Sequence, residues 1–274
     1  MGGSQAASAQ DVQVTGPLAG APACRHCRIY RDGRIQLQPF AGFTLVDEYS
    51  RTMIFGLQAQ YHFTDWLGLG LWGGYGGVHI DTALTDEITT GGQVTDRNSL
   101  SLPDPAAFPN QIGQIDWVGA LQVTFIPLRG KLALFQELFV DSDFYFFGGI
   151  AAVGLEERAD VDATTGSTCA SVIGGAASDP ICLQSQNERA TRVAIAPTFG
   201  VGLMVYFNEF IGLSMEWRAL PFSWNTSGTD EAGGPPDADF PDGVIDSDDQ
   251  IFHFNHMVNI GLAFYLPASI EVTE

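Results

Sequence analysis

The sequence predicts an all-β fold, an eight-stranded antiparallel up-and-down transmembrane β-barrel with three long extracellular loops and an N-terminal periplasmic extension. Three observations predict it. Eight stretches of about ten residues alternate apolar residues with polar or small ones. Short turns and long acidic loops join these stretches in alternation, and no apolar run is long enough for a transmembrane helix. A closed barrel is the only sheet that can span a bilayer, because it leaves no edge hydrogen bonds unmade.

The first four strands show the alternation most clearly. We expect them at 34–45, 51–63, 66–80 and 114–126. In the second, Leu57 falls on one side and Gln58 and Gln60 on the other. In the third, leucines alternate with glycines, which suits the inner wall of a narrow barrel where facing side chains crowd. The polar and small residues are therefore assigned to the lumen and the apolar residues to lipid.

The last four strands are expected at 142–155, 190–207, 210–222 and 251–266. Residues 144–147 are apolar on both sides, so the facing of the fifth strand stays ambiguous. In the sixth, the outward side carries Val193, Ile195 and Phe199. The connector 127–140 lies on the short-turn side. Its apolar residues suit a short amphipathic helix: Leu132, Leu134, Phe135, Leu138 and Phe139.

The long loops carry most of the acid. The chain has a formal net charge of −20, from 12 cationic and 32 acidic residues. Nineteen of the 32 acidic residues lie in 81–113, 156–189 and 225–250. Nucleic acid is excluded as a partner, because binding it needs a basic face. The simplest interpretation is a solvated acidic rim, and the alternative is a surface that attracts divalent cations.

The chain divides into an N-terminal extension at 1–33, a barrel at 34–266 and a short periplasmic tail at 267–274. An even strand count places both termini on the short-turn side. We therefore expect the outer membrane of a Gram-negative bacterium, with the termini in the periplasm. The string Ala7-Ser8-Ala9 resembles a signal-peptidase site without a hydrophobic core before it, so we expect the exporting segment to be missing from this sequence.

Four cysteines form two local pairs, Cys24 with Cys27 and Cys169 with Cys182. An even count in an exported protein predicts disulfides, so all four are disulfide candidates. Cys24 and Cys27 also form a C-x-x-C, which leaves a redox or metal role open. No second pair follows at zinc-finger spacing.

The lumen is expected to hold a polar network. Its predicted members share the inward side of their strands: Gln58, Gln60, Asp116, Arg192, Glu216, Arg218 and His253, with His62, Gln122 and Asn255 beside them. Glu216 and Arg218 lie two residues apart on one side of one strand, and charges in such an interior need partners. This favours a structural plug, and the alternative is a narrow path for water or protons.

The last acidic loop resembles a calcium-binding loop. Its candidate ligands are Asp237, Asp239, Asp242, Asp246 and Asp248. Gly243 supplies the bend, as calcium loops require. An extra residue separates Asp239 from Asp242, and no bidentate Glu follows. Calcium is the one cofactor that the sequence suggests, against a plain solvated loop.

Catalysis has little support in the sequence. The chain contains no Gly-x-Ser-x-Gly and no His-Glu-x-x-His. His253, Asp116 and Ser214 could form a rim triad, but nothing in their spacing singles them out. We expect no enzymatic activity.

Several motifs resemble the outer-membrane β-barrel proteins of myxobacteria and related predatory bacteria. The likeness covers 16–266 and is carried by Gly16-Pro-Leu-Ala-Gly-Ala-Pro22, Asp47-Glu-Tyr-Ser-Arg-Thr52, Asp65-Trp-Leu-Gly-Leu-Gly70, Trp72-Gly-Gly-Tyr-Gly76, Gly130-Lys-Leu-Ala-Leu-Phe135 and Asp143-Phe-Tyr-Phe-Phe-Gly-Gly149. It implies the barrel, and for some members a role as an outer-membrane subunit of gliding-motility or envelope-spanning assemblies. Cys24, Cys27 and the Asp-rich last loop have no match in that resemblance.

The predicted function is that of a structural or interaction subunit of an envelope complex, with a motility role implied by the resemblance. Its expected partners are outer-membrane lipid and other envelope proteins, and self-association is left open. One alternative is a narrow channel or small-solute transport barrel. A second is a soluble, lipocalin-like ligand-binding barrel, in which the apolar side of each strand would face inward.

Overall fold

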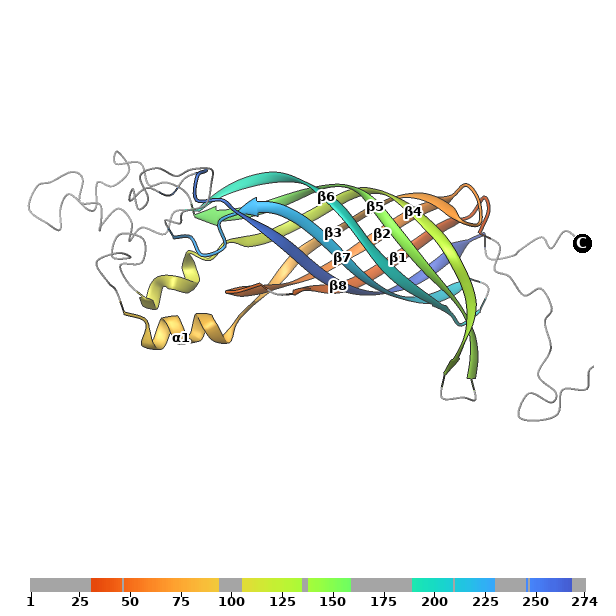
Figure 1. Ribbon diagram of the computed structural model, residues 1–274, viewed down its shortest axis with the longest axis horizontal. Coiled ribbons are helices and arrows are strands. Elements are labelled where there is room, and N and C mark those ends of the chain that lie inside the picture. Colours follow the sequence, from red (N-terminus) through yellow and green to blue (C-terminus); the bar gives the residue numbers. More distant parts are fainter. Residues whose placement is uncertain are drawn as a thin grey trace, which may run out of the picture.

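A closed ring of strands forms the body of the molecule (Figure 1). The computed structural model describes residues 31–45, 47–93, 105–134, 138–158, 189–208, 210–229, 245 and 247–267. Within these ranges, the side chains of 107, 131–134 and 138–140 are outside the description.

The described residues contain eight strands and two short helices. Their bounds in chain order are β1 Ile35–Leu45, β2 Ser50–His62, β3 Leu67–Asp81, α1 Ala83–Gly91, η1 Pro105–Asn110 (a 3₁₀ helix), β4 Gln114–Leu134, β5 Leu138–Arg158, β6 Arg189–Tyr206, β7 Ile211–Trp224 and β8 Ile251–Leu266. Each strand pairs antiparallel with the next, and β8 closes on β1, where Leu266 lies opposite Ile35. The predicted eight-stranded up-and-down barrel is confirmed.

The outer wall is apolar and the inside is polar. On the wall, Leu71, Ile150 and Ile195 are 63%, 66% and 69% exposed, whereas inside, Gln58 and Arg218 are 2% and 0% exposed. Thirty-two large apolar side chains are exposed in the described residues, far more than a soluble protein leaves in contact with water. This is the pattern of a transmembrane barrel. It is the reverse of a lipocalin-like barrel, so that alternative is wrong.

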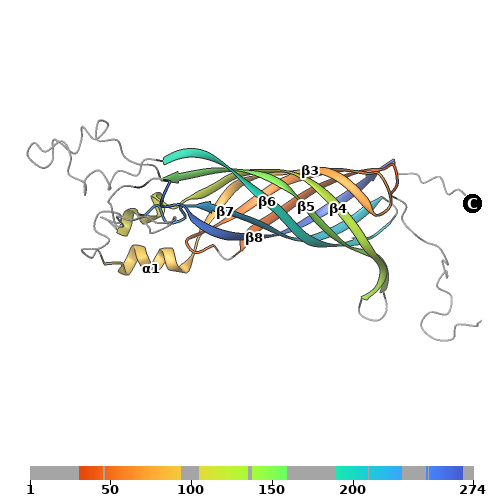
Figure 2. The same ribbon diagram turned by 45° about the horizontal axis from the view of Figure 1, so that its top comes forward.

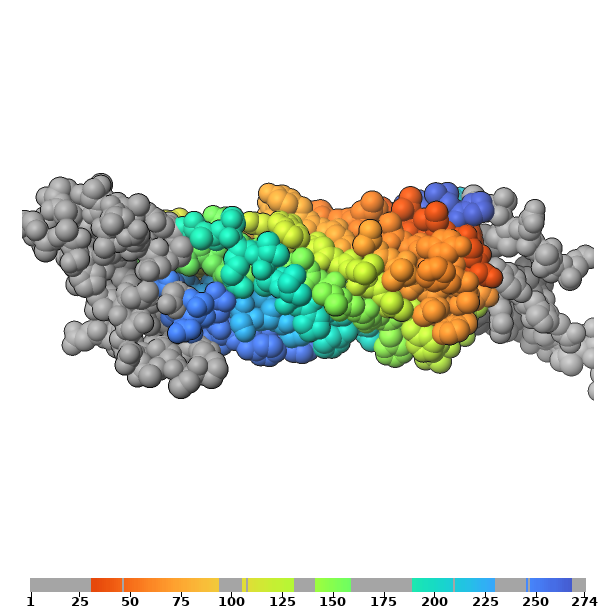
Figure 3. Space-filling model, turned by 90° about the horizontal axis from the view of Figure 1, so that it is seen from above, coloured from red at the N-terminus to blue at the C-terminus, as the bar shows by residue number. Residues whose placement is uncertain are grey.

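The strands wind obliquely around the cylinder, as the successive colour bands in Figure 3 show. Their connections define two ends. At the loop end lie the connections after β1, β3, β5 and β7. At the terminal end lie the connections after β2, β4 and β6, together with Arg31 before β1 and Pro267 after β8 (Figures 1 and 2).

The connector 127–140 differs from the prediction. In its described parts it is strand rather than amphipathic helix, because β4 and β5 continue through it as a hairpin with Leu128 opposite Phe144 and Leu134 opposite Leu138. Apolar spacing in so short a segment fits helix and strand alike. Here the segment is strand because the backbone pairing of β4 with β5 continues into it from the barrel.

The described residues of the loop after β3, 82–93 and 105–113, form structure that was not predicted. They contain α1 and η1, and Phe108 and Ile112 form a small core with Tyr49 and Ile88. The Thr85 hydroxyl donates to the Tyr49 carbonyl at 2.6 Å, which ties α1 to the connection between β1 and β2. Neither helix in the described part of the chain has the length and apolar character needed to cross a membrane.

The structure resolves the facing of β5. Tyr145 and Phe147 point into the lumen at 5% exposure each, and Phe146 faces outward. In β6, Val193, Ile195 and Phe199 face outward as predicted. The remaining strand ends lie within two residues of the predicted ones, apart from those of β4 and β5.

Candidate functional site: a filled lumen and a folded cap

A buried ion pair occupies the middle of the lumen. Both partners are on β7, where alternate residues face inward. The Arg218 guanidinium donates to Glu216 Oε1 from Nε at 3.1 Å and from Nη2 at 2.9 Å. It also donates to Thr198 Oγ1 at 2.9 Å and to Gln122 Oε1 at 2.6 Å. The guanidinium thus reaches three strands.

Aromatic rings and further donors complete this central pair. The Arg218 guanidinium lies 4.2 Å from the ring centroids of both Trp72 and Phe147. Glu216 also accepts a hydrogen bond from the Asn259 amide at 3.2 Å, and one from the Tyr145 hydroxyl at 3.4 Å. Each charge is therefore compensated by an opposite charge, by hydrogen bonds or by a ring face, which burial at this depth requires.

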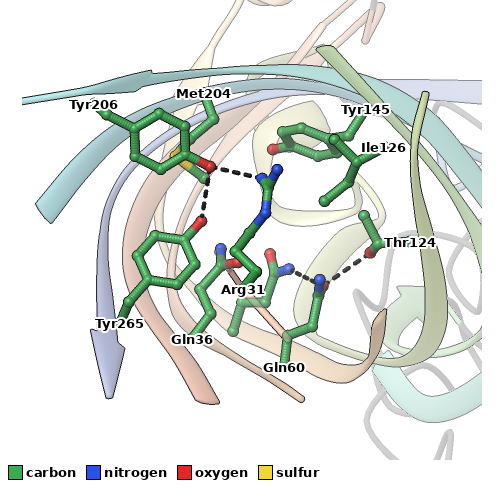
Figure 4. A pocket seen from close by; sticks show the side chains of 10 residues that line it. Arg31, Gln36, Gln60, Thr124, Ile126, Tyr145, Met204, Tyr206 and Tyr265 are labelled. Carbon is green, nitrogen blue, oxygen red and sulfur yellow. Dashed lines mark hydrogen bonds between the residues drawn. The ribbon is translucent and has the colours of Figure 1, made fainter. Parts of the chain in front are cut away.

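A second polar network fills the terminal end (Figure 4). Arg31, which precedes β1, reaches into the barrel and is 1% exposed. Its Nη1 donates to Asp143 Oδ2 at 2.6 Å and to the Tyr206 hydroxyl at 2.7 Å. The Tyr206 and Tyr265 hydroxyls lie 3.3 Å apart. Arg31 therefore closes the terminal mouth from inside.

Glutamines line the wall beside Arg31. The Gln36 amide donates to Gln38 Oε1 at 2.7 Å, and the Gln58 amide donates to Gln60 Oε1 at 3.0 Å. A cavity of about 10 Å³, room for roughly one water molecule, lies between these residues and the tyrosines. Gln58 Oε1 and Arg31 Nη2 are buried and have no hydrogen-bond partner among the described residues.

Asp65, in the turn between β2 and β3, joins three elements at the terminal end. It accepts hydrogen bonds from the backbone N–H of Arg31 at 2.8 Å and from that of Asp32 at 3.3 Å. Its other carboxylate oxygen lies 3.5 Å from Arg129 Nη1 on β4. Partial burial acts to raise the pKa of Asp65, but these donors and the charge of Arg129 outweigh it and hold the pKa below its ordinary value.

Toward the loop end, the lumen becomes apolar. Phe40 stacks on Trp72 with ring centroids 4.6 Å apart. The buried side chains of this layer come from all eight strands: Phe40, Ile54, Trp72, Ile115, Val118, Ala120, Ala151, Val153, Leu155, Ala194, Ala196, Leu220, Phe222, Trp224 and Met257. An eight-stranded barrel is narrow enough for such side chains to fill it. Apolar side chains therefore fill most of the described lumen at this level, where the buried Asn255 accepts a hydrogen bond from Trp224 Nε1 at 3.2 Å.

The described loop residues at the loop end pack together, and we call them the cap: 47–49, 82–93, 105–113 and 225–229. The backbone N–H of Gly113 donates to the Thr226 carbonyl at 3.0 Å, which joins the loop after β3 to the loop after β7. Arg158 Nη1 donates to Gln111 Oε1 at 3.2 Å and to the Gly228 carbonyl at 2.7 Å. Gly228 has φ +64°, and a Cβ there would meet the Gln111 carbonyl. Only glycine permits this close approach.

Ion pairs at the mouth hold the cap to the strands. Arg192 donates to both carboxylate oxygens of Glu157, at 2.6 and 3.0 Å. Glu157 also accepts a hydrogen bond from the backbone N–H of Asn225 at 2.9 Å, just after β7. Arg189 lies 3.8 Å from Glu156 and donates to the carbonyls of Asn110 and Ile112.

The structure separates the predicted lumen residues into three places. Gln58 and Gln60 lie in the terminal-end network, and Glu216 and Arg218 form the central pair. The other three lie toward the loop end. Arg192 donates to Glu157, and the His253 ring lies against the Trp224 ring. Asp116 lies at a bulge in β4, where Glu156 and His79 are the nearest titratable groups that influence it. The predicted lumen residues do not form one network.

The imagined rim triad is not assembled. The Ser214 hydroxyl donates to the Gly261 carbonyl. His253 pairs in register with Phe222, eight residues farther along β7. That is on the order of 26 Å at the rise of a strand.

Other predicted sites lie wholly or partly outside the described residues. The outside residues are Cys24, Cys27, Cys169, Cys182, Asp237, Asp239, Asp242 and Asp246. Asp248 is described and exposed. Among the described residues, no group of three or more His, Cys, Asp or Glu could hold a metal ion.

The sequence reasoning missed the residues that close the terminal end. Arg31 was assigned to an extension, and Asp143 to the start of a strand whose facing was ambiguous. The inward tyrosines were missed because an inward search for polar residues passes over Tyr145, Tyr206 and Tyr265. Their regular position on the inward side of β5, β6 and β8 is the signal that could have identified them.

Comparison with known proteins gives only distant likenesses. No family model matches the chain, and no curated protein sequence matches it. The N-terminal β-barrel domain of Pseudomonas aeruginosa OprF is similar in structure, with TM-score 0.44, 10% identity, and coverage of 86% of this chain and 98% of that one. Pseudomonas aeruginosa OprG has a TM-score of 0.41 and 11% identity, with coverage of 86% of this chain and 97% of that one. The attachment invasion locus protein Ail of Yersinia pestis has a TM-score of 0.36 and 8% identity, with coverage of 86% of this chain and 99% of that one. The fold of this chain rests on its own strand pairing and burial pattern.

Proposed function

We propose that this protein is an outer-membrane barrel that serves as a structural and interaction subunit of an envelope complex, with a closed lumen and a folded partner-binding cap. The observation that carries the proposal is the filling of the lumen. From Arg31 through the Arg218–Glu216 pair to the apolar layer, side chains occupy the described interior. A barrel closed in this way acts through its surfaces.

The filled lumen argues against transport as the main role. A channel needs a continuous polar path, and the layer around Trp72, Leu155 and Phe222 interrupts it with tightly packed apolar groups. The cavity at the terminal end, beside Arg31, has room for about one water molecule. A narrow channel would require this layer to move aside.

The cap supports an interaction role. Loops that serve only as a solvated rim need no core, yet this cap has its own, made by Phe108, Ile112, Tyr49 and Ile88. Leu84, on α1, is 43% exposed at the surface of the cap. A folded, exposed surface on a rigid barrel is a suitable platform for a protein partner.

The expected orientation follows from the connections. Outer-membrane barrels carry short turns and both termini on the periplasmic side and long loops outside. In this orientation the terminal end faces the periplasm and the cap faces outward. The resemblance to myxobacterial barrels supports the narrower proposal that the complex serves gliding motility. Self-association is a further outcome that the experiment below distinguishes.

The test is photocrosslinking in intact cells. A photoreactive amino acid replaces Leu84 on the cap, and Leu121 on the outer wall of β4, 54% exposed, serves as the matched membrane-facing control. We expect a discrete protein adduct from position 84 and none of that mass from position 121. Adducts containing only this chain would indicate self-association in place of a larger complex.

Conductance supplies the opposing test. Purified protein in a planar bilayer should show no stable single-channel conductance. Reproducible conductance, lost when the central or apolar layer is altered, would overturn the closed-lumen proposal in favour of the narrow channel.

A further inference from the structure

A small cavity lies between Arg31 and the inner wall of the barrel at the terminal end (Figure 4). Its volume of about 10 Å³ is close to what one water molecule needs. Polar side chains border most of it, and Ile126 and Met204 border the rest. We propose that this cavity is a binding site for one structural water molecule, which bridges Arg31 and Gln58.

Arg31 brings unused hydrogen-bond donors to the cavity. It is 1% exposed, and its Nη1 already donates to Asp143 Oδ2 at 2.6 Å and to the Tyr206 hydroxyl at 2.7 Å. Its Nε and Nη2 are buried and have no hydrogen-bond partner among the described residues. Burial of a donor without a partner is costly, and more so when the donor is charged. The guanidinium therefore favours an occupant that accepts a hydrogen bond.

Gln58 brings an unused acceptor to the same cavity. It is 2% exposed, and its Nε2 donates to Gln60 Oε1 at 3.0 Å. Its Oε1 is buried and has no partner in the described part of the chain. Turning the Gln58 amide over would set its oxygen against Gln60 Oε1, which also accepts from the Thr124 hydroxyl at 2.8 Å. The amide therefore keeps this orientation, and Gln58 Oε1 favours an occupant that donates a hydrogen bond.

The two side chains together select a molecule that both accepts and donates hydrogen bonds. An anion on the Arg31 guanidinium would face the Gln58 oxygen, and a cation on that oxygen would face the guanidinium. The volume excludes organic molecules. Water meets both demands, and a buried water typically makes about three hydrogen bonds. Tyr145, Tyr206 and Tyr265 also line the cavity, and their hydroxyls can supply the third.

The water joins two hydrogen-bonded groups of the terminal-end network. The first group contains Arg31, Asp143, Tyr206 and Tyr265, and the second contains the inward glutamines of β1 and β2. Among the described residues, no side-chain hydrogen bond connects the two groups, and Figure 4 shows them as separate sets of dashed lines. A water bound to Arg31 and Gln58 makes them one network. The proposal concerns the interior of the barrel and is independent of the role as a complex subunit.

The test detects the water through methyl groups, whose protons do not exchange with solvent. The full chain, deuterated except at the methyl groups of isoleucine and methionine, is placed in lipid nanodiscs. Magnetisation transfer from water is then recorded as cross-peaks in NOE and ROE spectra. Ile126 and Met204 line the cavity and are the probes. Ile54 and Met257, buried in the apolar layer of the lumen, are the matched controls.

We expect water cross-peaks at Ile126 and Met204 and none at Ile54 and Met257. Their signs should be opposite in the NOE and ROE spectra, as direct contact with a long-lived water requires. Absence of cross-peaks at Ile126 and Met204 would overturn the water site and leave the closed lumen standing. Equal cross-peaks at all four methyl groups would overturn both, because water would then fill the lumen and not one site.

Two variants test which residue holds the water. Gln58→Met keeps the length of the side chain and removes its acceptor, so it should abolish the cross-peaks at Ile126 and Met204. Gln38→Met is the matched control, because Gln38 is also 2% exposed but does not line the cavity, and it should keep them. Cross-peaks that survive in Gln58→Met would come from exchange of the tyrosine hydroxyls and would overturn the bridge. The methyl spectrum of each variant reports whether it folds, and the unsubstituted protein tests the site without any variant.

Discussion

The two halves of the lumen differ in how many polar groups fill them, although the terminal half also packs Ile126, Phe147 and Met204 against its tyrosines. The terminal half holds a hydrogen-bonded set of glutamines, tyrosines and Arg31, whereas the loop half holds aromatic and aliphatic side chains in contact. Arg218 marks the boundary, with its guanidinium in the polar network and the Trp72 ring against it. Each buried polar side chain needs a particular hydrogen-bond partner, whereas the apolar side chains need only fill the available volume. The two halves should therefore respond differently to substitution.

The largest effect is expected where the two halves meet. Arg218→Ala leaves Glu216 charged and buried, and removal of one partner of a buried pair costs about 3–5 kcal/mol. The free energy of unfolding of the protein in lipid vesicles, measured by urea titration, should fall by that amount.

The matched control removes both charges. In Arg218→Met with Glu216→Leu, the centre becomes as apolar as the loop half, so the loss should be much smaller than in Arg218→Ala. If the double variant is as unstable as the single one, the charge pair is not what limits stability at the boundary.

A cavity in the apolar half should have the next largest effect. Leu220 is 1% exposed inside the barrel, and Leu220→Ala should cost about 3 kcal/mol, since neighbours fixed to the barrel wall cannot collapse into the space. Leu262→Ala, on the lipid-facing wall of β8, is the control. Lipid chains can fill that space, so its cost should be about 1 kcal/mol or less. Equal losses in the same urea titration would contradict the distinction between inside and wall.

Two carboxylates at opposite ends should give opposite pH effects. At the loop end, burial raises the pKa of Asp47 from 3.8 to about 6, against the lowering effects of Thr44 and Arg51. The folded state therefore holds this proton more tightly than the unfolded state, so the stability that Asp47 contributes is lost as pH rises from about 4 to about 6. Asp47→Asn should stabilise the protein by up to about 3 kcal/mol above pH 6 and by nothing below pH 4.

Asp65 provides the comparison at the terminal end. Its pKa is lowered, so it stabilises the folded state at neutral pH, and this stability is lost on acidification. Asp65→Asn should therefore destabilise the protein at pH 7. Unfolding curves of both variants across pH 4–8 measure the two signs, and a stabilising Asp65→Asn would show that its backbone donors contribute nothing.

The smallest effect is expected at the terminal end, where Arg129 on β4 meets Asp65. The Arg129–Asp65 pair is partly exposed, with side chains 22% and 24% accessible, so Arg129→Ala should cost less than about 1 kcal/mol. The difference from the unsubstituted protein should shrink in high salt, because exposed charges are screened. A salt-independent loss would indicate that the Arg129 side chain acts by packing.

Strand positions and facing could be predicted from the sequence because each strand has lipid on one side and the filled lumen on the other. Lipid selects residues such as Leu71 and Ile195, and the lumen selects Gln58 and Arg218, so the alternation is strong. Where both sides are apolar, as at Phe144 to Phe147, the alternation vanishes and facing could not be predicted. Only the pairing of β5 with its neighbours determines it.

The missed features depend on contacts between distant residues. Arg31 donates a hydrogen bond to Asp143, 112 positions away in the sequence, and no sequence pattern near Arg31 indicates that partner. The connector 127–140 was predicted as a helix because its spacing of leucines fits helix and strand alike, and its described parts are strand because they continue the backbone pairing of β4 with β5. The central pair was easier to predict, since Glu216 and Arg218 are two residues apart on one strand.

The closure of β8 on β1 has a consequence for biogenesis. The seam joins the two ends of the barrel sequence, and Arg34 secures it by donating to the carbonyls of Tyr265 and Pro267, 231 and 233 positions away. Contacts between such remote residues form late, because the intervening chain must first be ordered. Until β8 has been synthesised and delivered, the growing sheet keeps β1 as an open edge. The barrel can therefore be sealed only once the chain as far as Pro267 is present, and the hydrogen bonds of Arg34 then hold the seam closed.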